Sequence, residues 1–220
     1  MDYRFRFDVV TSNLSFLLEG LGMTLLISFL SLVVSVAIGL FIAICRRSST
    51  RWISFPAATY CELFRDTPVL VQLFWVYYVL PVLTGVRLSA FSAVVIGLSL
   101  NSGAFLAEIF RAGIQAVPRG QLDAARVLGM SRALTMRRIV LPQAIRVVLP
   151  PMGNDFVALI KFSSLASTFA VGEITRKATE LSSFTFRPIE IFTFIALVYF
   201  FICWPLSMSI RFLERRLQLA

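Results

Sequence analysis

Apolar side chains are gathered in five long runs along the chain, separated by shorter segments that contain most of the charged residues. A helix needs about 20 mostly apolar residues to cross the hydrocarbon core of a bilayer. The runs therefore predict an all-α integral membrane protein with five transmembrane helices, in a single domain over residues 1–220. The predicted spans cover about residues 22–45, 57–82, 90–112, 152–171 and 189–210.

The positions of the arginines give these spans an orientation. An odd number of spans places the two termini on opposite sides of the membrane. With the N-terminus outside, most of the arginines, including those of residues 113–145, lie in the cytoplasm. Cytoplasmic loops are enriched in Lys and Arg, so we expect the N-terminus outside and the C-terminus in the cytoplasm.

Two of the runs carry small residues at four-residue spacing. The positions are Ser31, Ser35, Gly39 and Ala43 in the first run, and Ser89, Ala93, Gly97 and Asn101 in the third. Small side chains let two helices approach closely in lipid. Packing within one subunit is the favoured interpretation of both ridges, and a dimer interface stays open.

Composition narrows the range of functions. Hydrophobic residues make up 58% of the chain and charged residues 15%, which is more apolar surface than a soluble domain of this size buries. There is no histidine, and the three cysteines lie apart in apolar runs, so we expect neither a catalytic residue nor a metal site. The net charge of +9 lies beside the span ends, which indicates a lipid environment and no nucleic-acid partner.

The fourth run contains polar residues that are costly in a membrane. Lys161 alone costs about 3 kcal/mol near the centre of a span. Asn154 precedes it by about two helical turns, so both should lie on one face that points into the protein or a wet cavity. We also expect Pro150, Pro151 and Gly153 to break the helix where it enters from the cytoplasm.

The third run contains two further polar positions. Asn101 has no obvious partner on its own helix, which makes it a candidate for the substrate path. Glu108 lies three residues before Arg111, and this spacing favours an ion pair on one helix face.

The segment of residues 113–145 is the largest one predicted in the cytoplasm, and its pattern predicts two short helices. Pro118 suits the first position of one helix, and Gly129 suits the residue just past its end. Ser131 is expected to cap the second helix, which should stop at Pro142. Such a segment suits docking to another protein, but its arginines also suit an amphipathic element on the membrane surface.

Three motifs resemble one known family. The run Asp123-Ala124-Ala125, then Gly129, then Leu141-Pro142 resembles the EAA motif of ABC importer permeases, with Asp123 where that family usually has Glu. The segment 62–68 resembles the E-x-x-R-G-T-P segment of polar amino acid permeases of the histidine/glutamine/glutamate type. The run from Lys161 to Leu165 is similar to that family's K-D-(S/T)-S-L, without its acidic residue.

The resemblance implies an ABC type I importer permease in the bacterial inner membrane, which imports polar L-amino acids and is not itself an enzyme. Two sets of residues follow from it. The ATPase-coupling set is Gln121, Asp123, Ala124, Ala125, Gly129, Leu141 and Pro142. The substrate-path candidates are Asn101, Glu108, Asn154, Asp155, Lys161, Ser163 and Ser164.

The resemblance also implies partners. These are a cytoplasmic ABC ATPase dimer, a second permease subunit in a homodimer or heterodimer, and an extracytoplasmic amino acid-binding protein. The charged segment of residues 172–187 is a candidate surface for docking this binding protein, although a solvated charged loop is the simpler interpretation. ATP and magnesium would be bound by the ATPase, and the chain has no Gly-x4-Gly-Lys-Ser/Thr loop of its own.

A hypothesis from another class is an ion- or proton-coupled secondary amino acid carrier. Lys161, Asp155 and Glu108 would be its titrating groups. The five runs show no recognisable inverted repeat, which argues against such a carrier.

Overall fold

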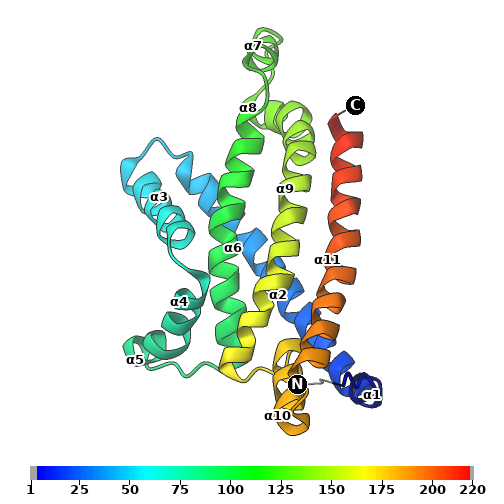
Figure 1. Cartoon of the computed structure of the whole chain (residues 1–220). Coiled ribbons are helices and arrows are strands. Elements are labelled where there is room, and N and C mark those ends of the chain that lie inside the picture. Colours follow the sequence, from blue (N-terminus) through cyan, green and yellow to red (C-terminus); the bar gives the residue numbers. More distant parts are fainter. Residues whose placement is uncertain (1–3, 219–220) are drawn as a thin grey trace.

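A computed structural model of the protein describes residues 4–218, and most of them are helical (Figure 1). The elements in chain order are α1 (Asp8–Ser12), α2 (Leu14–Arg46), α3 (Arg51–Asp66), α4 (Val69–Phe74), η1 (Trp75–Val79), α5 (Leu80–Thr84), α6 (Ala90–Gln115), α7 (Arg119–Val127), α8 (Arg132–Thr135), η2 (Met136–Val140), α9 (Leu141–Phe162), η3 (Ser163–Phe169), α10 (Ile174–Thr185) and α11 (Pro188–Gln218). Elements η1 and η2 are π-helical, and η3 is a 3-10 helix.

Three helices, α2, α6 and α11, are each long and apolar enough to cross a membrane. The number rises to five if each of two bent helix pairs counts as one span: Arg51–Asp66 with Val69–Thr84, and Arg132–Phe169 with Ile174–Thr185. The all-α membrane fold is therefore confirmed, while its orientation stays a prediction. Helix α1 and the C-terminal end of α11 lie at opposite ends of the bundle, and α7 projects at the end where α11 finishes (Figure 1).

The prediction of one continuous span over residues 57–82 is wrong. The chain bends by 112° between α3 and α4, at Thr67-Pro68. Proline has no N–H to continue the helix, and it disfavours helical geometry in the residue before it. Thr67 accordingly has an extended backbone with φ −111° and ψ 147°.

The breaks predicted at Pro142 and at Pro150-Pro151 are also wrong. Helix α9 continues through Pro150, Pro151 and Gly153, and the chain stays helical from Arg132 to Phe169. The π-helical turn η2 precedes Pro142, which lies in the first turn of α9. Tertiary packing holds the later turns, because Gly153 lies against Ile210 of α11.

The ridge of small residues on α2 packs against α6 within the same chain. Ser31, Ser35, Gly39 and Ala43 are all buried. The Ser31 hydroxyl donates to the Val95 carbonyl at 3.5 Å, and the Ser99 hydroxyl donates to the Ser31 carbonyl at 3.3 Å. Packing within one subunit is confirmed for this ridge.

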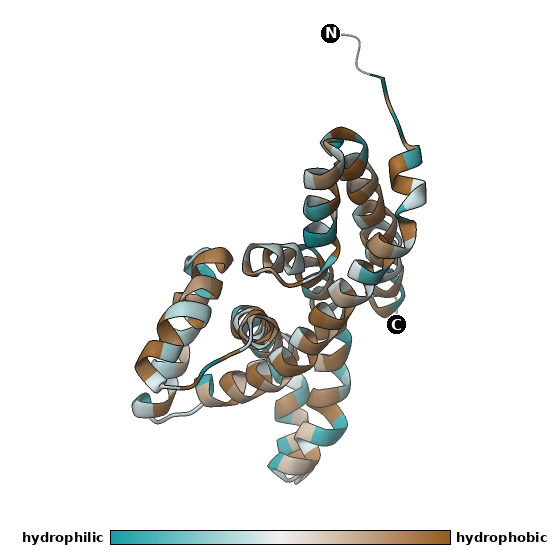
Figure 2. Ribbon diagram, turned by 90° about the horizontal axis from the view of Figure 1, so that it is seen from below, coloured by the Kyte–Doolittle hydropathy of each residue, from teal (hydrophilic) through white to brown (hydrophobic). Residues whose placement is uncertain are grey.

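The long helices consist mostly of hydrophobic residues (Figure 2), and many of their large apolar side chains are exposed, as expected of a protein solvated by lipid. Phe41 of α2 and Phe201 of α11 are each 66% exposed. Burial cannot explain such positions, whereas contact with hydrocarbon does. The protein is therefore a multi-pass membrane protein.

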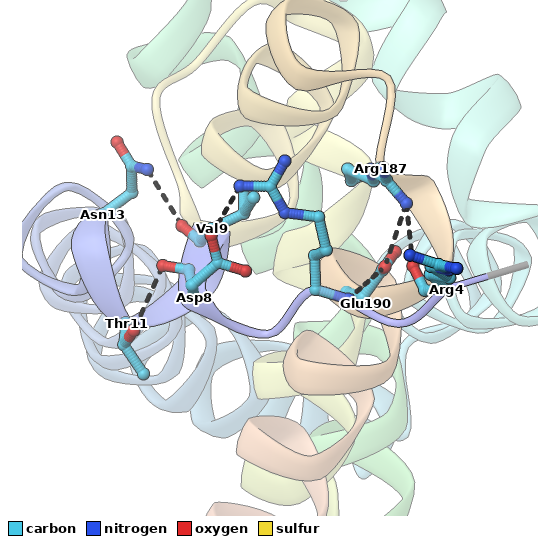
Figure 3. Close-up of polar contacts among 8 residues, drawn as sticks. Arg4, Asp8, Val9, Thr11, Asn13, Arg187 and Glu190 are labelled. Atoms are coloured by element: carbon cyan, nitrogen blue, oxygen red, sulfur yellow. Dashed lines mark hydrogen bonds and ion pairs between the residues drawn. The ribbon is translucent and has the colours of Figure 1, made fainter.

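At the end opposite α7, the N-terminal segment is fastened to the start of α11 (Figure 3). The buried Glu190 carboxylate accepts a hydrogen bond from the Arg6 backbone N–H at 2.9 Å. Arg187 lies 3.8 Å from the same carboxylate and donates to the Arg4 carbonyl at 3.0 Å. The N-terminal segment and the start of the last helix therefore meet in one polar cluster.

The α2–α6 contact generates a stability prediction. A methyl group at Gly39 would come within 2.8 Å of Leu106 Cβ, so we expect Gly39→Ala to lower the unfolding free energy by about 1–3 kcal/mol. Gly22→Ala on the same helix is the control, because its added methyl meets nothing within 4 Å. Denaturation of the purified protein in detergent measures both variants. Equal stability of the two would contradict the close packing.

Candidate functional site

Helix α7 is set off from the bundle by local signals at both of its ends (Figure 1). Pro118, with φ −57° and ψ 134°, lies just before the first helical residue, Arg119. The helix therefore begins one residue later than predicted. Gly129 has the left-handed φ of +67°, and the next residue, Met130, donates its N–H to the Ala125 carbonyl at 3.0 Å. The predictions of a glycine past the end of the first helix and of a serine cap on the next are confirmed, since the Ser131 side chain accepts from the Leu134 N–H.

The surface of α7 is apolar at its tip. Because the helix lies outside the bundle, Val127 and Leu128 are 87% and 78% exposed. Ala124 is exposed beside them, whereas Ala125 is buried within the loop. Asp123 is exposed and forms an ion pair with Arg126 at 2.9 Å. The tip therefore offers a small apolar surface with charges at its side.

A pair of glutamines joins α7 to the start of α9. The Gln143 side-chain amide donates to the Gln121 side-chain oxygen and, at 2.9 Å, to the Ile139 carbonyl. Leu141 and Pro142 lie in the same turn and are exposed. Gln143 does not belong to the predicted coupling set, because its partner is 22 positions away and no local pattern marks it. The structure thus brings Gln121 beside Leu141 and Pro142.

Glu108 lies between two arginines near the α7 end of α6. Arg111 donates to its carboxylate at 2.7 and 3.0 Å, which confirms the predicted ion pair. Arg46, the last residue of α2, contacts the other carboxylate oxygen. This second partner has no local signal in the sequence, since it belongs to another helix. The cluster joins α2 to α6 electrostatically.

Asn101 is buried, and its side-chain amide donates a hydrogen bond to the backbone at the α3–α4 break. The Asn101 side chain donates to the Phe64 carbonyl at 2.9 Å and to the Gln72 side-chain oxygen at 3.1 Å. The Gln72 amide donates to the carbonyls of Phe64 and Thr67 at 2.8 and 3.0 Å. These carbonyls would otherwise lack donors, which is costly away from water. The role of Asn101 in the substrate path remains a prediction beside this structural one.

The other path candidates lie along α9 and η3. The Asp155 carboxylate accepts a hydrogen bond from Ser102 of α6. Asn154 and Lys161 are exposed on the surface of the single chain, so they do not point into it, and the alternative that they face a wet cavity stays a prediction. The hydroxyls of Ser163 and Ser164 donate to carbonyls three positions earlier in their own helix, at 2.8 and 2.7 Å. The seven candidates are therefore not gathered in one cavity of the chain.

Comparisons with known proteins agree with this architecture. A family model described as "Binding-protein-dependent transport system inner membrane component" matches residues 35–219. The "Probable amino-acid ABC transporter permease protein YckA" of Bacillus subtilis is 39% identical over 215 residues, which cover 98% of this chain and 95% of the relative. The glutamine transport system permease protein GlnP of Escherichia coli is 36% identical over 217 residues, with 98% and 99% covered. A solved structure described as "Crystal structure of an amino acid ABC transporter with histidines" matches 97% of this chain and 100% of its own, at 40% identity and a TM-score of 0.91.

The amide pair at the α3–α4 break generates a second stability prediction. We expect Asn101→Ala to lower the unfolding free energy by about 1–3 kcal/mol, because it leaves the buried Gln72 side-chain oxygen without its donor and removes one of the two donors to the Phe64 carbonyl. Gln72→Ala should act through the same groups, so the double variant should lose less than the sum of the two losses. Asn154→Ala, at an exposed asparagine, is the control. If Asn101→Ala were as mild as this control, the structural role would be refuted.

Proposed function

The chain belongs to the family of binding-protein-dependent transport system inner membrane components, and we propose that it is the subunit through which an ATP-driven importer moves polar L-amino acids across the bacterial cytoplasmic membrane. Members of this family are transmembrane permease subunits of ABC importers, and the ATPase is a separate subunit. The chain is accordingly a permease subunit and not itself an enzyme. The observation that carries the proposal is a projecting helix fixed to a bundle of membrane-length helices.

Helix α7 is the part that would contact the ATPase. Its exposed Val127 and Leu128 provide an apolar contact that the chain itself leaves uncovered. The hydrogen bond between Gln121 and Gln143 links α7 to the start of α9, so a displacement of α7 would be transmitted there. Because the chain is helical from Arg132 to Phe169, a displacement of α7 by the ATPase would reach the far end of the bundle without a hinge at the prolines.

The exposed polar residues of α9 support pairing with a second permease subunit. Asn154 and Lys161 lie on the surface of α9, which belongs to the bent helix pair Arg132–Phe169 with Ile174–Thr185 that together is apolar enough for a membrane. A cation at that depth is stable only beside protein or water. A second copy of the chain or a sister permease would cover this face and would create a polar path between the two subunits, with Asp155 on one wall.

The same arrangement supports the remaining assignments. The end with α7 would face the cytoplasm, where ATP and magnesium are bound by the ATPase and not by this chain. The opposite end, with α10, would face the extracytoplasmic binding protein. The segment of residues 172–187 supports this assignment, because Arg176 and Glu180 of α10 form a partly exposed ion pair of 2.7 Å that a partner protein could contact.

Transport in reconstituted vesicles tests the proposal. With the ATPase in the membrane, ATP on the ATPase side and the binding protein on the other side, we expect uptake of one or more labelled polar L-amino acids. Omitting the ATPase or the ATP should abolish this uptake. Uptake driven by an ion gradient without the ATPase would instead support a secondary carrier and would refute the ATP-driven importer.

The left-handed glycine after α7 generates a prediction about docking. Valine is strained at φ +67°, so we expect Gly129→Val to redirect the end of α7 and to weaken binding of the ATPase by about tenfold. Asparagine is of similar size but tolerates this backbone, and Gly129→Asn should bind nearly as well as the natural chain. Co-purification with increasing ATPase concentrations measures both. Equal losses would point to bulk at this surface and not to backbone geometry.

A further inference from the structure

A second candidate site lies where α2 ends and α3 begins. A pocket of about 460 Å³ opens there, lined by Arg46, Arg51, Ser54, Phe55 and Ala58. Two of the five lining side chains are guanidinium groups, and the others are a hydroxyl, an aromatic ring and a methyl group. The pocket therefore combines anion-binding groups with an apolar wall.

The positive charge around this pocket is not neutralised by the chain. Arg46 contacts Glu108, but that carboxylate also binds Arg111, so two guanidinium groups share one negative charge. Among the described residues, Arg47 and Arg51 have no acidic side chain within ion-pair distance. No side chain caps the N-terminus of α3, whose helix dipole adds to the positive potential. The pocket therefore favours an anion.

The side chains around the pocket also place it at a membrane boundary. Phe41 and Ile44 of α2 are 66% and 70% exposed, and the arginines begin two residues after Ile44. On α3, Trp52 is 90% exposed and Phe55 is 71% exposed. Exposed aromatic rings beside a basic segment are typical of the layer where lipid headgroups meet hydrocarbon.

We propose that this pocket binds the phosphate of an anionic phospholipid. Arg51 and Arg46 would contact the phosphate oxygens, because a guanidinium presents paired N–H donors that match them. Phe55 and Trp52 would lie beside the upper part of the acyl chains. A free phosphate ion would satisfy the arginines but would leave these exposed rings without a role, which favours a lipid as the ligand.

The proposal goes beyond amino acid transport, and it can be tested without transport. The complex of the permease with its ATPase is purified in detergent, titrated with phosphatidylglycerol and analysed by native mass spectrometry. We expect the natural complex to retain phosphatidylglycerol in preference to phosphatidylcholine. Arg51→Gln should weaken this retention by about fivefold, as expected for one arginine near an anionic headgroup.

Arg215→Gln is the matched control, because it removes one exposed arginine from the end of α11 without touching the pocket. It should leave phosphatidylglycerol retention unchanged. Equal losses in the two variants, or no preference for phosphatidylglycerol in the natural complex, would overturn the proposal. Arg46 is unsuitable as a test, since its removal would also unbalance Glu108.

A second measurement separates the two sources of phosphate. Inorganic phosphate at millimolar concentration should not displace phosphatidylglycerol from the natural complex. Displacement by phosphate, with the same dependence on Arg51, would show a site for the free ion and would overturn the lipid assignment. Because lipid retention is measured without amino acid or ATP, its failure would leave the proposed transport function intact, and failure of transport would not alter the lipid result.

Discussion

The requirement that every backbone carbonyl find a donor in an apolar environment governs the least regular part of this fold. Between α3 and α4 the chain turns by 112°, and the helix can no longer satisfy the Phe64 and Thr67 carbonyls with its own N–H groups. The amides of Gln72 and Asn101 supply the missing donors. The position of α4 against α6 depends on this exchange. The bend therefore depends on side chains of α4 and α6 and not on the proline alone.

In contrast to the bent α3–α4 pair, the segment that contains α9 is helical without a break. The segment Arg132–Phe169 stays helical although it contains three prolines, because a π-helical turn precedes the first of them and α11 packs against the turns around the other two. One continuous helical segment therefore connects the base of α7 with the far end of the bundle. A bent α3–α4 pair and a straight α9 lie on either side of α6 (Figure 1). The bundle thus contains both a sharply bent helix pair, α3–α4, and a continuous helix, α9.

The features that the sequence predicted correctly are local. Membrane-length helices follow from the lengths of the apolar runs, and the end of α7 follows from Gly129, because a left-handed residue is a property of one position. The partners of Asn101 and Glu108 could not be predicted in this way. Gln72 and Arg46 are 29 and more residues away in the chain, so only the packing of helices brings them together. The coupling and path residues stay predictions, since their partners are other molecules.

The polar cluster at the N-terminal end has a consequence for biogenesis. Arg6 meets Glu190, and Glu19 on α2 meets Lys177 on α10, so early residues depend on partners that the ribosome makes much later. Helix α2 must therefore form with this end of the fold unfinished, and this end can close only after α10 and the start of α11 have been synthesised. The start of the final helix thus holds the N-terminal segment in the folded chain. This end of the fold is therefore completed late in the synthesis of the chain.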